Sequence, residues 1–105
     1  MTPMSQKRFE ISLPFDLAIP KIELAIRNIG GNIINNNPQK GIFVAEKRAS
    51  FTSWGEKIKV WVNPTGNGCS VNIISESALA LTLVDWGKNA NNIVAFESEL
   101  KRIST

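Results

Sequence analysis

Two short segments of the chain each combine a tryptophan, a glycine and a lysine within four residues. They are Trp54-Gly55-Glu56-Lys57 and Asp85-Trp86-Gly87-Lys88. An indole ring offers a flat apolar surface to a ligand, and a lysine offers a positive charge to a phosphate or carboxylate. Both segments lie where one expected element ends and the next begins, and binding residues are often found on such connections. Each segment is therefore a candidate binding site.

The second segment has two interpretations. In the one that we favour, Asp85 caps the helix expected to follow it, Trp86 packs into the core, and Gly87 lets a neighbouring backbone approach closely, so all three residues are structural. In the alternative, the amides at the start of the helix and Lys88 hold an anion. The Asp85 carboxylate would compete with that anion for the same positive helix end.

The first segment is also open to two interpretations. It can be a tight connection between strands, in which Gly55 adopts a backbone conformation that other residues avoid and Trp54 covers a sheet edge. Alternatively, Trp54 lines the mouth of a ligand pocket together with neighbouring hydroxyl groups. The candidate ligand-binding residues from the two segments are Trp54, Gly55, Lys57 and Lys88.

No catalytic signature accompanies these segments. The sequence contains no histidine, which is the usual general base near neutral pH and the commonest metal ligand. Its serines lack an activating partner in a known pattern, and its glycines form neither a dinucleotide-binding motif nor a phosphate-binding loop. We therefore expect no enzymatic activity, no metal site and no cofactor. The single cysteine, Cys69, falls in an alternating strand pattern, which indicates a small buried side chain.

Composition indicates one ordinary folded domain spanning residues 1–105. Hydrophobic residues make up 43% of the chain and charged residues 20%, far from the composition of disordered proteins. We expect a cytoplasmic protein without a membrane partner, because the sequence has neither a signal-peptide pattern nor a membrane-spanning apolar run. The net charge of +3 arises from 12 basic and 9 acidic residues spread along the chain, so charge alone favours no partner.

Alternation of apolar and polar residues predicts the strands, because successive side chains of a strand point to opposite faces. The expected strands are 7–13, 32–36, 41–49, 56–63 and 69–75. Turn-forming residues at 37–40 join the second and third of these into a hairpin. The apolar segment 78–84 fits either an edge strand or a buried crossover, since periodicity does not decide for so short a run.

Apolar residues at helical spacing predict two helices. The first runs from Pro20, which suits the first helical position, to Ile29, after which two glycines end it. Asp16 could cap an earlier start, but Pro20 would then lie where a backbone N–H is needed, so a kinked or broken entry is expected over 15–19. The second helix follows Asp85 and reaches the C-terminus. Its apolar stripe is Ala90, Ile93, Phe96, Leu100 and Ile103.

The order strand, helix, four strands, helix predicts an α+β two-layer sandwich, with an antiparallel sheet of about five strands and both helices on one face. This order resembles the TATA-binding-protein-like group of folds. The closing stretch Asp85-Trp86-Gly87-Lys88-Asn89-Ala90-Asn91-Asn92-Ile93 resembles that of small bacterial proteins of unknown function with such a layout. The resemblance covers most of the chain and implies a fold, but it implies no activity, because this fold group hosts unrelated functions.

Two helices can cover only one face of the sheet, so the other face meets solvent or a partner. The alternation places on that face Arg8, Glu10, Ser12, Ile42, Val44, Glu46, Arg48, Lys57, Lys59, Trp61, Ser70, Asn72 and Ile74. The candidate interface residues among them, for a second copy or for nucleic acid, are Arg8, Arg48, Lys59 and Trp61. Basic side chains around an aromatic ring suit single-stranded nucleic acid, whereas the apolar members suit a homodimer. Self-association ranks first, because acidic residues on this face reduce its positive charge.

The leading hypothesis is a non-catalytic module that binds a small apolar or amphipathic ligand or a second copy of itself, and nucleic-acid binding is the alternative. The ligand hypothesis predicts a cavity between sheet and helices, reached past Trp54. Both surface hypotheses require Trp61 to lie on the uncovered face of the sheet. A buried Trp61 would contradict them.

Overall fold

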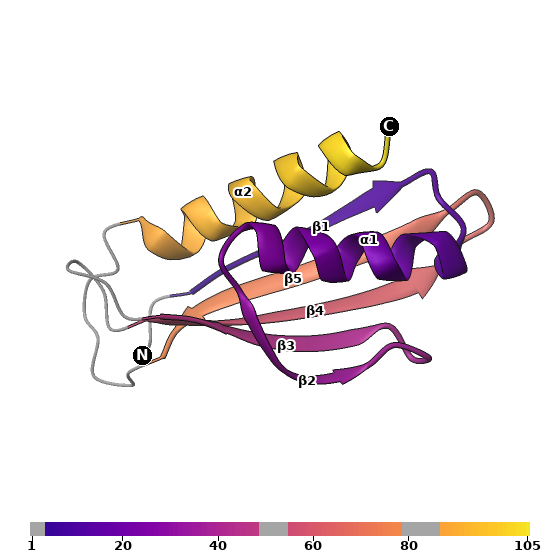
Figure 1. Cartoon of the computed structure of the whole chain (residues 1–105). Coiled ribbons are helices and arrows are strands. Elements are labelled where there is room, and N and C mark those ends of the chain that lie inside the picture. Colours follow the sequence, from indigo (N-terminus) through magenta and orange to yellow (C-terminus); the bar gives the residue numbers. More distant parts are fainter. Residues whose placement is uncertain (1–3, 49–54, 79–86) are drawn as a thin grey trace.

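The computed structural model describes residues 4–48, 55–78 and 87–105. Five strands form one antiparallel sheet in the order β1-β5-β4-β3-β2, and both helices lie on the same side of it (Figure 1). The elements are β1 (Met4–Ile11), α1 (Phe15–Asn28), β2 (Asn32–Asn37), β3 (Ile42–Lys47), β4 (Glu56–Pro64), β5 (Cys69–Ser77) and α2 (Lys88–Ile103). The predicted α+β class, the element order and the antiparallel sheet are confirmed.

The core lies between the sheet and the helices and follows the predicted alternation. Its fully buried side chains come from β3, β4, β5, α1 and α2, and the largest of them are Phe43, Phe96, Ile22, Ile26, Ile58, Ile73 and Leu100. The apolar residues of β1 join them, and the Phe9 and Phe96 rings pack with their centroids 6.2 Å apart. Burial of this continuous apolar surface is the main force that holds the two layers together.

Helix α1 begins at Phe15, so the predicted start at Pro20 is wrong. Pro14 occupies the N-cap position in an extended conformation, and its carbonyl accepts hydrogen bonds from the amides of Leu17 and Ala18 at 3.0 and 2.9 Å. Pro20 lies inside the helix and cannot donate to the carbonyl of Asp16. This loss falls in the first turn at an exposed residue, where water can replace the missing donor, and burial of the apolar face outweighs it.

The predicted turns at 30–31 and 37–40 are confirmed. Gly30 has a φ of +94°, and the amide of Gly31 donates to the carbonyl of Ile26 at 2.9 Å, as in a helix stop built on glycine. In the β2–β3 hairpin, the amide of Lys40 donates to the carbonyl of Asn37 at 3.0 Å. Both glycine and asparagine thus appear where their backbone preferences predict them.

Helix α2 begins at Lys88, and Gly87, with a φ of +76°, occupies the N-cap position that we predicted for Asp85. Asp85 and Trp86 lie outside the described residues, as does the segment 79–84, so the predicted structural roles of Asp85 and Trp86 stay predictions. Within the described part of the chain, neither helix is both long enough and apolar enough to cross a membrane.

Glu99 connects the two helices. It accepts hydrogen bonds from Arg102 on its own helix at 2.8 Å and from Asn28 of α1 at 2.6 Å. These bonds, those of Arg102 first, lower the pKa of Glu99 from its ordinary value of 4.5 to about 2.

A lowered pKa in the folded state makes the contribution of Glu99 to stability dependent on pH. This contribution is fully present above the pKa that Glu99 has in the unfolded chain. It is lost as the pH falls through the lower pKa that Glu99 has in the folded protein. We expect Glu99→Gln to lower the urea midpoint at about pH 6, and we expect its difference from the unmodified protein to shrink by about pH 2. The matched control is Glu10→Gln, because Glu10 forms no ion pair with any described residue. A difference that stays constant across this range would contradict the prediction.

Candidate functional site

Trp61 lies on the face of the sheet opposite the helices, as predicted, and its side chain is half-buried. On β4 it is flanked by Ile42 of β3 and by Asn72 of β5. The next row along the strands places Lys59 between Val44 and Ile74. Ile42, Val44, Trp61 and Ile74 therefore form an apolar cluster across three neighbouring strands. Ile42 leaves 43% of its surface exposed.

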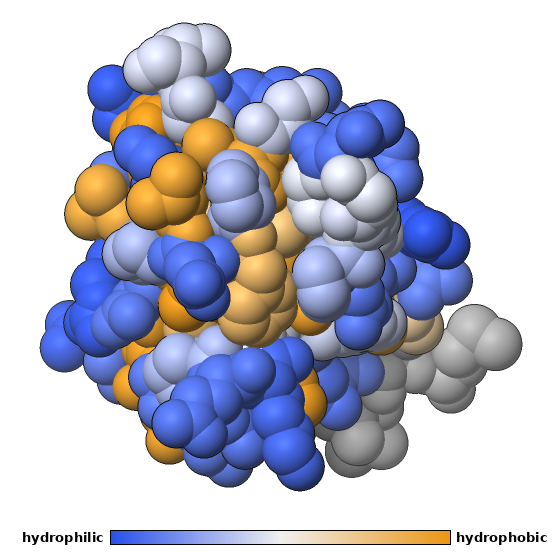
Figure 2. Space-filling model, turned by 90° about the vertical axis from the view of Figure 1, so that its right-hand side faces the viewer, coloured by the Kyte–Doolittle hydropathy of each residue, from blue (hydrophilic) through white to orange (hydrophobic). Residues whose placement is uncertain are grey.

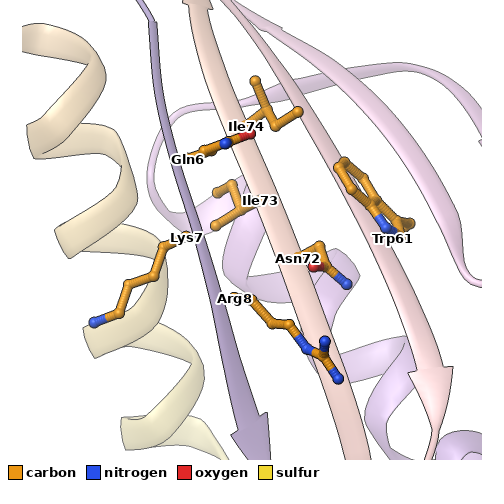
Figure 3. Close-up of a pocket in the computed structure, with 7 residues that line it drawn as sticks. All are labelled: Gln6, Lys7, Arg8, Trp61, Asn72, Ile73 and Ile74. Atoms are coloured by element: carbon orange, nitrogen blue, oxygen red, sulfur yellow. The ribbon is translucent and has the colours of Figure 1, made fainter.

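A pocket of about 320 Å³ adjoins this cluster on the side of β1 and β5. Its lining residues are Gln6, Lys7, Arg8, Trp61, Asn72, Ile73 and Ile74 (Figure 3). Lys7 points away towards α2, where its Nζ lies 2.6 Å from Glu97, and Ile73 belongs to the buried core. The side chains available to a ligand are therefore those of Gln6, Arg8, Trp61, Asn72 and Ile74.

One hydrogen bond orients the guanidinium group of Arg8. Its Nε donates a hydrogen bond to Ser70 Oγ at 2.8 Å, and Ser70 is only 2% exposed. Within the described ranges, Arg8 forms no ion pair. The terminal nitrogen atoms of its guanidinium group extend over β5 towards β4 (Figure 3). The pocket therefore combines an apolar ring, two side-chain amides and a fixed positive charge.

The predicted interface residues are not all neighbours. Arg8 and Trp61 line one pocket. Lys59 lies beside the apolar cluster and forms an ion pair with Glu76 at 3.7 Å. Arg48 follows the end of β3, about 20 Å along that strand from the residue opposite Trp61. The positive charges of this face are thus dispersed.

The predicted ligand-binding residues are separated as well. Lys57 belongs to β4 and pairs with Glu46 across the uncovered face, whereas Lys88 begins α2 on the other side of the sheet. Gly55 has a φ of +95° and precedes β4, which agrees with the predicted tight connection. Trp54 lies outside the described residues, so the cavity expected past it stays a prediction.

A cluster of buried polar side chains lies beneath the start of α2. Its members are Glu56, Ser75, Ser77, Asn89 and Asn92, each exposed by 7% or less. The Nδ2 of Asn92 donates to Glu56 Oε1 at 2.9 Å and to Ser75 Oγ at 3.0 Å. Its Oδ1 accepts from the Nζ of Lys47 at 2.8 Å. Asn92 thus joins strands β3, β4 and β5 to the helix.

Sequence reasoning missed this cluster, although a signal was present. Glu56, Ser75 and Ser77 occupy inward positions of their strands, in phase with the buried Ile58 and Ile73. Asn89 and Asn92 precede Phe96 on the buried side of α2. Polar residues at core positions need hydrogen-bond partners. Because these five polar residues all fall at inward-facing positions, the sequence pattern could have predicted that they form a hydrogen-bonded cluster.

Cys69 is buried, as its strand position predicted. Its Sγ donates to the carbonyl of Leu13 at 3.2 Å, and burial raises the pKa of its thiol. A raised pKa lowers the reactive thiolate fraction. Among the described residues, no three acidic, cysteine or histidine side chains gather where they could hold a metal ion.

Two further hollows lie at the end of the molecule where α1 begins, with volumes of about 370 and 430 Å³. Phe15 lines both of them. At this end, apolar side chains gather in the middle and hydrophilic ones border them (Figure 2). Among the described residues that line these hollows, Asp16 alone is charged. The pocket beside Trp61 combines more kinds of binding group and is the candidate site.

No protein-family model and no curated protein matches this sequence. Among solved structures, the crystal structure of Ara h 8.0201 is similar, with a TM-score of 0.50 and 11% sequence identity. The match covers 97% of this chain and 99% of that one. This likeness concerns the fold alone. It agrees with an antiparallel sheet that packs against helices.

Proposed function

We propose that this protein is a non-catalytic binding module that holds a small amphipathic ligand on the uncovered face of its sheet. The observation that carries the proposal is the pocket in which the Trp61 ring and Ile74 lie beside the polar groups of Gln6, Arg8 and Asn72. Ligand sites commonly combine an apolar lining with a few convergent polar groups. The proposal places the ligand on the opposite side of the sheet from the cavity expected past Trp54.

The affinity expected from such a pocket is modest. A flat ring that removes about 100 Å² of apolar surface from water gains about 2.5 kcal/mol, and hydrogen bonds from the polar side chains add to it. Association also requires the loss of translational and rotational freedom. Dissociation constants on the order of 0.1 to 1 mM are therefore expected for simple ring compounds.

A homodimer is the second candidate function. The observation that favours it is the apolar cluster around Trp61, with Ile42 substantially exposed at its edge. Two copies that packed their uncovered faces together would bury this cluster. Nucleic-acid binding has weaker support, because Lys59 and Lys57 lie next to Glu76 and Glu46.

The ligand proposal predicts that a neutral ring compound binds beside Trp61. We expect titration with naphthamide, followed by NMR of backbone amide and indole N–H groups, to shift the Trp61 signal, with a dissociation constant of about 1 mM or below. Trp61→Leu should weaken binding about tenfold, because the aromatic contact is lost, and the absence of its indole signal identifies Trp61 in the spectrum. Leu24→Ala is the control, since Leu24 is exposed on α1, on the other side of the molecule.

Two results would contradict the ligand proposal. One is the absence of any shift at Trp61 up to the solubility limit of naphthamide. The other is a Trp61 signal that changes with protein concentration alone and is insensitive to naphthamide. That second result, together with a doubled mass in sedimentation, would favour the homodimer.

A further inference from the structure

We infer that the pocket beside Trp61 is selective for a planar ring that carries a carboxylate or a phosphate, and that Arg8 provides this selectivity. The inference rests on the proposed function and deepens it by naming the ligand class. It depends on three features of Arg8: its anchoring, its distance from Trp61 and its lack of an ion-pair partner.

The anchoring of Arg8 limits the directions in which its guanidinium group can point. Nε is engaged by the buried Ser70 hydroxyl at 2.8 Å. A guanidinium group carries five N–H donors in a planar arrangement, so four remain for other partners. The terminal nitrogens can hold two oxygens of one anion at once, which is the geometry that favours carboxylates and phosphates over neutral groups.

The distance between Arg8 and Trp61 fits a ligand with a ring at one end and an anion at the other. Asn72 of β5 pairs with Arg8 on one side and with Trp61 on the other. Two strand spacings separate Arg8 from Trp61, which is about 10 Å between their backbones. A ring stacked on the indole can therefore extend an anionic group over Asn72 to the guanidinium.

Arg8 also differs from Lys7, the other cation that lines the pocket. The cations that form ion pairs with glutamates are Lys7, Arg27, Lys59, Lys101 and Arg102. Within the described residues Arg8 has no such partner. Glu10 lies on the same face, two positions further along β1, and no ion pair joins it to Arg8. The pocket thus contains a positive charge that the described residues leave uncompensated.

The test compares pairs of ring compounds in which one member carries an anionic group and the other is neutral. Naphthoate and naphthamide share one ring system, as do adenosine monophosphate and adenosine, so each pair isolates the anionic group, and the two pairs distinguish a carboxylate from a phosphate. We expect the protein to prefer at least one anion over its neutral counterpart by about tenfold. Arg8→Gln should abolish this preference, because it weakens binding of the anion more than binding of the neutral compound.

Two further variants make the assignment specific. Lys7→Gln removes the same charge from the neighbouring residue, whose side chain points to the helix layer, and it should keep the preference. Ser70→Ala removes the anchor of Arg8 and should reduce the preference only partly. The amide NMR spectrum of each variant verifies that it is folded.

The binding results separate the role of Arg8 from the existence of the site itself. Equal affinity for charged and neutral compounds, or a preference that persists in Arg8→Gln, would overturn the inference and leave the proposed function intact. Failure of all four compounds to shift Trp61 would overturn the proposed function as well. Binding of an oligothymidylate that weakens steeply with salt, without binding of adenosine monophosphate or naphthoate, would assign this face to nucleic acid instead.

Discussion

Replacement of Asn92 by leucine is expected to lower the free energy of unfolding by about 3 kcal/mol. Asn92 is 3% exposed, and its amide group satisfies partners on three sides. Leucine has a similar size but removes the donor to the Glu56 carboxylate and to Ser75. Glu56 is itself only 4% exposed, so water cannot readily replace this donor, and a buried charge that loses a hydrogen bond is strongly unfavourable.

The measurement is urea unfolding followed by circular dichroism, and the matched control is Asn91→Leu. Asn91 is the preceding residue of α2 and is exposed, so the same substitution there should change stability by less than about 0.5 kcal/mol. The expected result is a lower midpoint for Asn92→Leu with an unchanged slope. Equal midpoints for the two variants would show that the polar cluster contributes little to stability.

The second large effect is expected for Gly68→Ala, at about 3 kcal/mol. A Cβ atom at this position would lie 2.1 Å from the carbonyl oxygen of Ile11 and 3.1 Å from the Cα of Ser12. These are backbone atoms of the end of β1 and the residue after it, so no side chain can rotate to relieve the clash. Either the β4–β5 turn or the end of β1 must shift. Such a shift disturbs the pairing of Ile11 with Cys69 between β1 and β5.

The same turn contains the control for this prediction. A Cβ atom on Gly66 would have no neighbouring atom within 4 Å, so Gly66→Ala should leave stability nearly unchanged. Both variants replace a glycine by an alanine in one turn, and their effects on the unfolded chain are therefore similar. Thermal and urea unfolding of the pair measure the difference. A Gly68→Ala protein as stable as the Gly66→Ala protein would contradict the close approach of β1 to this turn.

The sequence predicted the faces of the strands well, because side-chain alternation is a local property. The inward positions of Ile58, Val60 and Val62 and the outward position of Trp61 follow directly from it. The start of α1 was predicted incorrectly, because the rule against proline in a helix is a local preference that burial of a whole helix face can override. Here the buried stripe that includes Ala18 and Ile22 made the longer helix favourable.

The candidate site could be predicted only in part. Alternation placed Arg8 and Trp61 on one face, but the order of strands decides which residues of a face are neighbours. The pairing of β1 with β5 brings Arg8 within two strands of Trp61, whereas Arg48 and Lys88 lie elsewhere. The same limit hid the cluster around Asn92, because its contacts depend on how α2 lies over β4 and β5.

The pairing of β1 with β5 also has a consequence for the order of folding. Strands β2 to β5 are consecutive neighbours in a meander, whereas the bond between Arg8 and Ser70 joins residues 62 positions apart. Contacts between distant residues require more chain entropy to form, so they usually slow folding. The pocket therefore exists only after β1 has joined the meander, and a ligand that spans Arg8 and Trp61 would stabilise this long-range pairing. Ligand occupancy would thus report directly that the N-terminal strand has docked.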